Sequence, residues 1–190
     1  MSLAVVSLLS AGAASAQSLA GVNTRLVSPL SSQTATQGQT VAVKLDGTVK
    51  TADGVKLTRG TELVGKITSV KPSQNGGPAS VTLTFTTAEL KGGKQIPVKA
   101  TLLAAFPGDQ GVEAQYSDST MNAVAGTVSG EQTIDQEPGA LPGVTLKSAV
   151  QAPNSGTFSK TDGNFKLAAG TFLQVGIAPA SNASSTSAAE

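Results

Sequence analysis

Residues 81–102 read VTLTFTTAELKGGKQIPVKATL. Apolar residues alternate with threonines over the first six positions, and after Gly92-Gly93 apolar residues again occupy every second position from Ile96 to Leu102. A period of two is typical of a strand with one buried face. Two glycines supply the positive φ angles that a two-residue hairpin turn requires. The stretch therefore predicts a β-hairpin.

A two-residue turn at Gly92-Gly93 also predicts the register of this hairpin, because side chains alternate strictly between the two faces of a strand. The predicted pairs are Lys91 with Lys94, Leu83 with Leu102, and Phe85 with Ala100. Pro97 has no N–H to donate to a ladder, so we expect the second strand to be an edge strand or to bend there.

Shorter alternating runs flank the hairpin on both sides. Asp53-Gly54 and Asp162-Gly163 are typical turn dipeptides between them, and residues 71–78 (KPSQNGGP) read as a loop. Only residues 111–126 leave room for a short helix. Residues 40–177 therefore predict one all-β domain, a small β-barrel or sandwich built from antiparallel hairpins with few or no helices. Its predicted inward residues include Val41, Val43, Leu45, Leu63, Gly65, Ile67, Val144, Leu146, Phe165, Leu167, Leu173, Val175 and Ile177.

The pattern K-L-x-x-G-T-x-L occurs twice, at residues 56–63 and 166–173. A Gly-Thr pair between two β segments predicts a tight corner, in which the glycine takes a φ angle that other residues avoid. We interpret the recurrence as one strand–turn–strand element used twice in a barrel. A tandem duplication is the alternative, but the intervening segments do not match.

The two ends of the chain differ in composition from its body. Residues 3–16 form an apolar run that closes with Ala14-Ser15-Ala16, which predicts a secretory signal peptide over residues 1–16 cleaved before Gln17. We therefore expect an exported protein, in the periplasm, at the cell surface or outside the cell, with no membrane span in its mature chain. Residues 17–39 predict a linker or a loosely attached first strand, and residues 178–190 a flexible tail rich in Ser and Ala.

The composition excludes several kinds of chemistry. The chain has no His, Cys or Trp, so it cannot form a Ser-His-Asp triad, a thiol nucleophile, a zinc–thiolate site or a disulfide. Nothing in the sequence predicts a catalytic, cofactor-binding or metal-binding residue, and we expect a protein that is not an enzyme. The net charge of +1 does not favour nucleic acid as a partner.

The charges are unevenly distributed along the chain. Residues 41–99 are basic, and Lys91, Lys94 and Lys99 form a small basic patch that we expect to protect an exposed strand edge. Residues 101–146 contain carboxylates but no lysine or arginine. These loop acids suggest either a calcium site or pairing with the basic half of a neighbouring molecule, although no calcium-loop spacing is present. They are Asp109, Glu113, Asp118, Glu131, Asp135 and Glu137.

Residues 38–106 resemble the start of the β-barrel of TrbI-like proteins, the outer-core scaffold of type IV secretion and conjugation systems. The resemblance lies in a first strand at residues 41–45, the corner at residues 55–65, and the hairpin return that follows Gly92-Gly93. The same order also resembles small exported proteins of unknown function from soil bacteria such as acidobacteria. The resemblance implies a barrel fold. The membrane helix, the long Pro-rich linker and the apolar helical insertion of TrbI-like proteins have no counterpart here.

Two functions are consistent with these features. The first is a non-enzymatic structural or assembly module of the bacterial envelope or extracellular space, which pairs with itself or another envelope protein through an edge strand or through residues 17–39. The alternative is a monomeric module that binds a surface polymer or partner protein through its acidic loops. A component related to a type IV secretion scaffold is a remote third.

Overall fold

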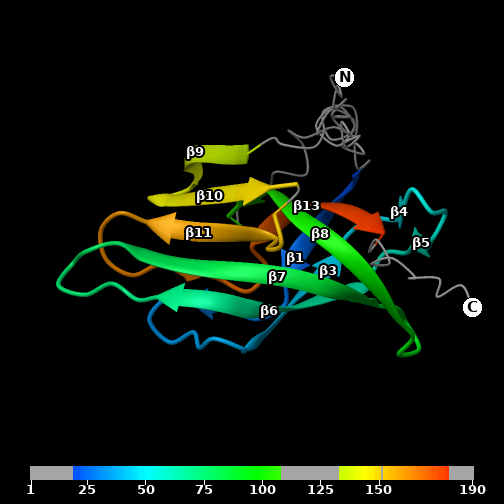
Figure 1. Cartoon of the computed structure of the whole chain (residues 1–190), viewed down its shortest axis with the longest axis horizontal. Coiled ribbons are helices and arrows are strands. Elements are labelled where there is room, and N and C mark those ends of the chain that lie inside the picture. Colours follow the sequence, from blue (N-terminus) through cyan, green and yellow to red (C-terminus); the bar gives the residue numbers. More distant parts are fainter. Residues whose placement is uncertain (1–18, 108–132, 151, 180–190) are drawn as a thin grey trace, which may run out of the picture.

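The computed structural model describes residues 19–107, 133–150 and 152–179, and of residues 133–140 and Pro179 the backbone alone. Six antiparallel strands form a closed barrel (Figure 1). The order round the barrel is β6-β3-β1-β13-β8-β7, and β7 pairs with β6 to close it. The six strands are β1 (Ala20–Leu26), β3 (Thr40–Leu45), β6 (Glu62–Lys71), β7 (Ala79–Glu89), β8 (Gln95–Phe106) and β13 (Phe172–Pro179).

The predicted fold class, an all-β small barrel, is confirmed. The described residues contain no helix, and therefore none long and apolar enough to cross a membrane.

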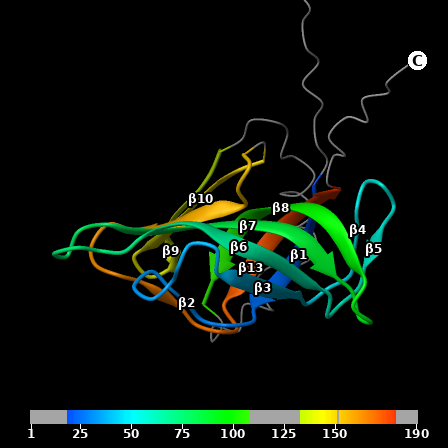
Figure 2. The same cartoon turned by 60° about the horizontal axis from the view of Figure 1, so that its bottom comes forward.

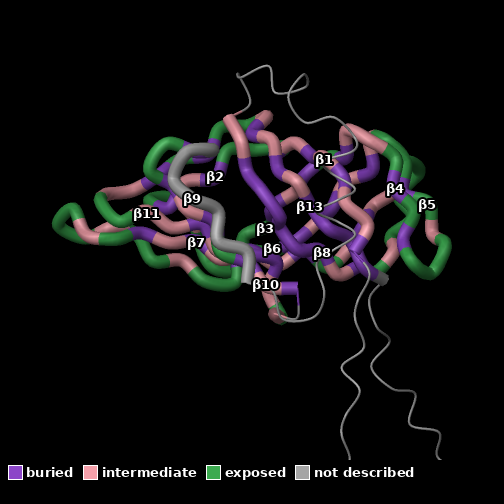
Figure 3. Tube along the Cα trace, turned by 90° about the horizontal axis from the view of Figure 1, so that it is seen from above, coloured by how far each residue is buried: buried purple, intermediate pink, exposed green. Residues whose placement is uncertain are grey.

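One apolar cluster fills the barrel, and in most of its strands buried positions alternate with more exposed ones (Figure 3). In β6, Leu63, Gly65 and Ile67 face inward as the alternation predicts, and in β7 the inward residues include Leu83 and Phe85. Barrels of this size are just wide enough for side chains to fill them. The largest fully buried side chains are Phe85, Phe158, Leu26, Leu30, Leu45, Leu57, Leu63, Ile67, Leu83, Leu102, Leu146 and Leu173.

Three more strands extend the sheet beyond the barrel. β11 (Gly156–Lys160) pairs with the first half of β7, β10 (Val144–Ala149) pairs with β11, and β9 (Thr133–Leu141) pairs with β10. Figures 1 and 2 show these strands stacked beside β7 and away from β1 and β3. We call the run β6-β7-β11-β10-β9 the side sheet; β9 is its outermost strand.

Ser155 lies where β7 leaves β8 and joins the side sheet. Its N–H donates to the carbonyl of Leu83 and its own carbonyl accepts from the N–H of Leu102, both at 2.8 Å. Its hydroxyl accepts from the N–H of Phe85 at 2.9 Å. Ser155 is 1% exposed, so these three bonds satisfy backbone groups that water cannot reach.

The repeated K-L-x-x-G-T-x-L pattern forms two equivalent corners. Gly60 and Gly170 have φ angles of +88° and +83°. Gly60 N–H donates to Leu45 O and Leu45 N–H to Thr61 O, and at the other corner Gly170 N–H donates to Leu26 O and Leu26 N–H to Thr171 O. Each corner therefore holds the end of a neighbouring barrel strand, β3 or β1, as one element used twice.

A short ladder accompanies each corner. β5 (Lys56–Leu57) pairs with β4 (Val49–Lys50), and β12 (Lys166–Leu167) pairs with β2 (Leu30–Ser31). The predicted Asp-Gly turns lie beside these ladders, with φ angles of +86° at Gly54 and +75° at Gly163.

The predicted hairpin of residues 81–102 forms, but its predicted register is wrong by one residue. The β7–β8 pairs are Thr87 with Pro97, Ala88 with Ile96, and Glu89 with Gln95. Leu90 N–H donates to Lys94 O, so the loop holds three residues, Lys91 to Gly93, rather than two. The other predicted pairs do not form. Leu83 lies opposite Gly156 of β11, and Leu102 and Ala100 lie opposite Val175 and Ile177 of β13.

Pro97 does not mark an edge strand. β8 lies between β7 and β13, and its last partner pair with β13 is Val98 with Pro179. Pro97 follows directly beyond that pair, where β13 has ended and the ladder on that side needs no N–H.

The structure also places the flanking segments differently from our expectation. Residues 17–39 contain β1, which pairs with β13 on one side and β3 on the other, so this part is neither a linker nor a loosely attached strand. The predicted tail begins at 178, yet β13 continues to Pro179 and Ala178 is buried. The predicted signal peptide, the possible helix at 111–126 and residues 180–190 lie outside the described residues.

Gly65 permits a close approach of β6 and β7. A Cβ atom there would lie 2.3 Å from Thr84 O and 2.7 Å from the Cα of Phe85. We predict that Gly65→Ala lowers the free energy of unfolding in urea by about 1–3 kcal/mol, because backbone atoms must move. Gly47→Ala is the matched control, since its Cβ would meet only Val22 at 3.6 Å. Equal stabilities of the two variants would contradict this packing.

Candidate functional site

The acidic residues expected to bind calcium or a partner are not brought together in the described part of the chain. Asp109, Glu113, Asp118 and Glu131 lie outside the described residues. Asp135 and Glu137 lie in β9, of which the backbone alone is described there. Among the described residues, no group of three or more acids has a spacing that could hold a metal ion.

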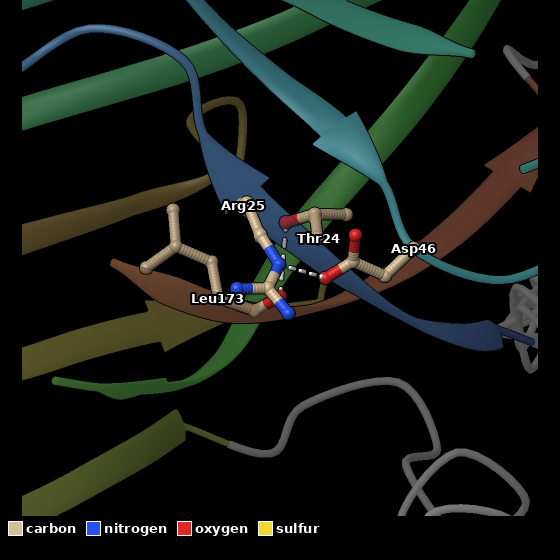
Figure 4. Close-up of polar contacts among 4 residues, drawn as sticks. All are labelled: Thr24, Arg25, Asp46 and Leu173. Atoms are coloured by element: carbon tan, nitrogen blue, oxygen red, sulfur yellow. Dashed lines mark hydrogen bonds and ion pairs between the residues drawn. The ribbon is translucent and has the colours of Figure 1, made fainter. Parts of the chain in front are cut away.

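A polar cluster on β1 holds three barrel strands together (Figure 4). The Nε of Arg25 donates to Asp46 Oδ2 at 2.6 Å, and the guanidinium carbon lies 4.0 Å from the centre of the Phe172 ring. Thr24 is fully buried and its hydroxyl donates to Leu173 O at 2.9 Å. These contacts join β1 to β13 and to the residue after β3, so we assign them a structural role.

The described side chains are strongly basic. They include all 13 lysines and arginines of the chain but only five of its 12 carboxylates. Besides Arg25 with Asp46, the described ion pairs include Lys44 with Glu62 at 3.7 Å. The charge asymmetry read from the sequence is therefore an asymmetry between the described side chains, which are mostly basic, and the rest of the chain, which includes the acids of β9. The five acids are Asp46, Asp53, Glu62, Glu89 and Asp162.

The small basic patch of the β7–β8 hairpin lies mainly at its tip. Lys91 and Lys94 are exposed, and Lys99 is half-buried within β8. The Lys91 side chain passes over the Gly60 corner, 3.0 Å from where a Cβ atom of Gly60 would lie. Within β8, residues 95–97 pair with β7 and residues 98–106 pair with β13.

The outer side of the side sheet carries hydroxyl groups in cross-strand rows. In the first row Lys71 lies opposite Ser80, Ser80 opposite Ser159, and Ser159 opposite Thr145. The second row aligns Ser69, Thr82, Thr157 and Lys147 across the same four strands, and Lys66 pairs with Thr84 beside it. We call these seven hydroxyl residues the hydroxyl face: Ser69, Ser80, Thr82, Thr84, Thr145, Thr157 and Ser159.

Hydrogen bonds confirm that these side chains share one face. The hydroxyls of Thr82 and Thr157 lie 2.9 Å apart, and those of Thr145 and Ser159 lie 2.7 Å apart. Ser69 is exposed and the other six residues are partly exposed, so solvent reaches all of them. The opposite side of the same strands holds buried residues such as Val81, Phe158 and Leu146.

The loop between β6 and β7, at one end of the side sheet, is fixed to the turn before β12. Asn164 Oδ1 accepts from the Ser73 N–H at 2.9 Å and from the Ser32 hydroxyl at 3.1 Å. Gly163 N–H also reaches the carbonyls of Gly76 and Gly77, both at 3.1 Å. The loop between β6 and β7 is therefore tied to the turn before β12, which makes the hydroxyl face a preformed surface.

Sequence reasoning interpreted the threonines of residues 81–86 only as the solvent side of a strand. The rows could not be recognised because they join β7 to β11, which is some 75 residues further along the chain, as in the Thr82–Thr157 contact. The available signal was the match between V-T-L-T and G-T-F-S-K at residues 156–160, both with hydroxyls at alternate positions.

No protein-family model matches this chain, and no curated protein matches its sequence. The assignment of the site therefore depends on its own residues.

The contact between Thr82 and Thr157 is directly measurable. We predict that Thr82→Val and Thr157→Val are coupled, with an interaction energy of about 0.5–1 kcal/mol, because cross-strand threonine pairs stabilise sheets by that amount. A double-mutant cycle in urea measures it. Additive effects of the two substitutions would show that the hydroxyls do not interact.

Proposed function

We propose that this protein is a non-enzymatic structural or assembly module of the bacterial cell envelope or extracellular space, exported by its N-terminal segment, and that it associates with itself through β9. The observation that carries this proposal is the position of β9. Each barrel strand has two neighbours, whereas β9 pairs with β10 alone among the strands that the structure describes.

An edge strand presents unpaired N–H and C=O groups to which a strand of another molecule can add. Pro138 within β9 fits this position, since proline is tolerated on edge strands. The ladder between β9 and β10 is irregular between Val144 and Leu146, but four consecutive pairs, from Leu146–Gln136 to Ala149–Thr133, follow without interruption. These four residues of β9 form the edge that we expect to pair.

Residues 17–39 are not the pairing segment in this proposal. β1 is an interior strand of a closed barrel, and its transfer to a neighbour would open the barrel between β3 and β13. Deleting residues 17–39 would therefore be expected to unfold the domain rather than to release an assembly.

Charge supports the same proposal. The described body carries an excess of lysine and arginine, whereas six carboxylates lie between residues 109 and 137, leading into and along β9. Attraction between the carboxylates of one copy and the basic side chains of the next would act beside the pairing of β9 and select one register.

Light scattering after size-exclusion chromatography of residues 17–190, with and without calcium, tests self-association. We expect a discrete oligomer or a filament that persists in roughly 0.5 M salt, where exposed charges are screened within a few ångströms, since backbone hydrogen bonds hold it together. A monomer at every concentration would contradict the proposal.

Two proline variants test the role of β9. Adjacent residues of a strand direct their N–H groups to opposite sides, so of Asp135 and Gln136 one faces β10 and the other the open edge. We predict that one of Asp135→Pro and Gln136→Pro abolishes the oligomer with an unchanged melting temperature, and that the other lowers the melting temperature. Retention of the oligomer in both folded variants would exclude β9 as the contact.

A second candidate is a monomeric module that binds a surface polymer or partner protein through the acidic loops. The concentration of carboxylates in residues 109–137, a stretch that contains no lysine or arginine, favours it. The triple variant Asp109→Asn, Glu113→Gln, Asp118→Asn is then expected to lose adhesion to cells or polymer, measured by a pull-down at equal protein concentration. Unchanged adhesion would exclude these loops.

The resemblance to the barrel of TrbI-like proteins supports a more distant proposal, a component related to a type IV secretion scaffold. Its support is the succession of strand, Gly-Thr corner and hairpin in residues 41–98. A barrel fold is shared by proteins of many functions, so it adds little about activity.

A further inference from the structure

The geometry of the side sheet points to a binding activity beyond self-association: we propose that the hydroxyl face binds an acidic polysaccharide, a glycan chain that carries carboxylate groups. This surface is separate from the open edge of β9 and from the acidic loops.

The hydroxyl face has the hydrogen-bonding capacity that a glycan needs. Each Ser or Thr hydroxyl has one donor and two acceptor positions. The bonds of Thr82 with Thr157 and of Thr145 with Ser159 use only part of this capacity. The remaining positions can bond to a sugar chain, whose hydroxyl groups donate and accept and whose carboxylate groups accept.

The spacing of the rows suits an extended polymer. Neighbouring strands lie about 4.8 Å apart, and alternate residues along one strand about 6.8 Å apart. A chain that lies across β6, β7, β11 and β10 meets a polar side chain on every strand, first Lys71, Ser80, Ser159 and Thr145. Because the loop at residues 72–78 is tied to Asn164, little ordering of the protein is required on binding.

The charges at the ends of the rows select an anionic ligand. Lys66 and Lys71 on β6 are exposed, and each lies in register with a hydroxyl residue of the face. None of the described side chains in the three rows is a carboxylate. Beyond Lys147 the second row meets Asp135 of β9, of which only the backbone is described.

None of the seven hydroxyl residues, nor the lysines in register with them, is aromatic, so the described rows offer no ring on which a sugar could stack. Phe85, Phe158 and Phe165 are buried in the apolar cluster, and Phe172 lies beneath Arg25. Recognition on this face therefore depends on hydrogen bonds and charge, which favours an acidic glycan over a neutral one.

A hollow adjoins the first row at Lys71. Its volume is about 250 Å³, and it is open to solvent. It extends the surface beyond β6 toward the end of the sheet and gives the terminal sugar of a bound chain a place beside a lysine. The hollow is lined by Val70, Lys71, Pro72, Gln74, Gly77 and Pro78.

Isothermal titration calorimetry with polygalacturonate oligomers, on residues 17–190, tests the proposal. We expect saturable binding that weakens as salt is added, no binding of dextran of equal length, and clearly weaker binding of poly-glutamate, which has the charge but no hydroxyls. Failure to bind polygalacturonate would overturn the proposal, and so would equal binding of poly-glutamate, since charge alone would then explain it.

Two variants locate the site. Thr82→Val with Thr157→Val removes two hydroxyls and keeps the side-chain shape, and we expect affinity to fall about tenfold. Lys66→Gln with Lys71→Gln is expected to have an effect of similar size. Its matched control is Lys50→Gln with Lys56→Gln, an exposed lysine pair on β4 and β5, with an affinity within about twofold of the parent. Should the threonine variant fail to fold, the two lysine pairs still decide the question.

The outcome is independent of self-association. The proline variant that is monomeric by light scattering is expected to bind polygalacturonate as the parent does, because β9 is not part of the hydroxyl face. Loss of binding in every monomeric variant would assign the polysaccharide to the assembly rather than to this face.

Discussion

The structure depends on one strand, β7, being shared between the barrel and the side sheet. Its second half pairs with β8 within the barrel, and its first half pairs with β11 in the side sheet. Two strands that part inside a protein leave backbone groups without partners, and each such group costs about 1–3 kcal/mol when buried. Ser155 removes that cost with its N–H, its carbonyl and its hydroxyl, which bind Leu83, Leu102 and Phe85. The side sheet, and with it both proposed surfaces, exists because this junction is satisfied.

At the same junction the side sheet, which carries both surfaces to which we assign a function, departs from the barrel. The barrel closes on itself and leaves no edge, and the two Gly-Thr corners hold the ends of β1 and β3 in equivalent positions. The side sheet leaves the barrel with one apolar side, one hydroxyl side and β9 as its outermost strand. Assembly through β9 and polysaccharide binding on the hydroxyl face therefore use different parts of one rigid extension, and neither requires a catalytic group.

Much of the fold was predictable from local sequence. Strict alternation in β7 and in the first part of β6 fixed which residues face inward, and the repeated Gly-Thr pattern predicted both corners. The register of the β7–β8 hairpin was not predictable, because Lys91 joins both glycines in the loop. A strand in residues 17–39 was one of two alternatives, but its interior position in the barrel was not predicted, because one of the inward residues of β1 is Thr24, whose buried hydroxyl binds Leu173 O. The Ser155 junction and the hydroxyl rows depend on long-range contacts such as Phe85 with Ser155 and Thr82 with Thr157, which join residues 70 and 75 positions apart and which no local pattern contains.

Amide hydrogen exchange measured by NMR tests the Ser155 junction most directly. If β7 is shared as described, the amide protons of Phe85 and Leu102 exchange as slowly as those of Leu26 and Leu45, which lie within the barrel, because all four are bonded and buried. Exchange of Phe85 and Leu102 at the rate of an exposed loop, with Leu26 and Leu45 still protected, would show that β7 and β8 do not part around Ser155 and would contradict the account.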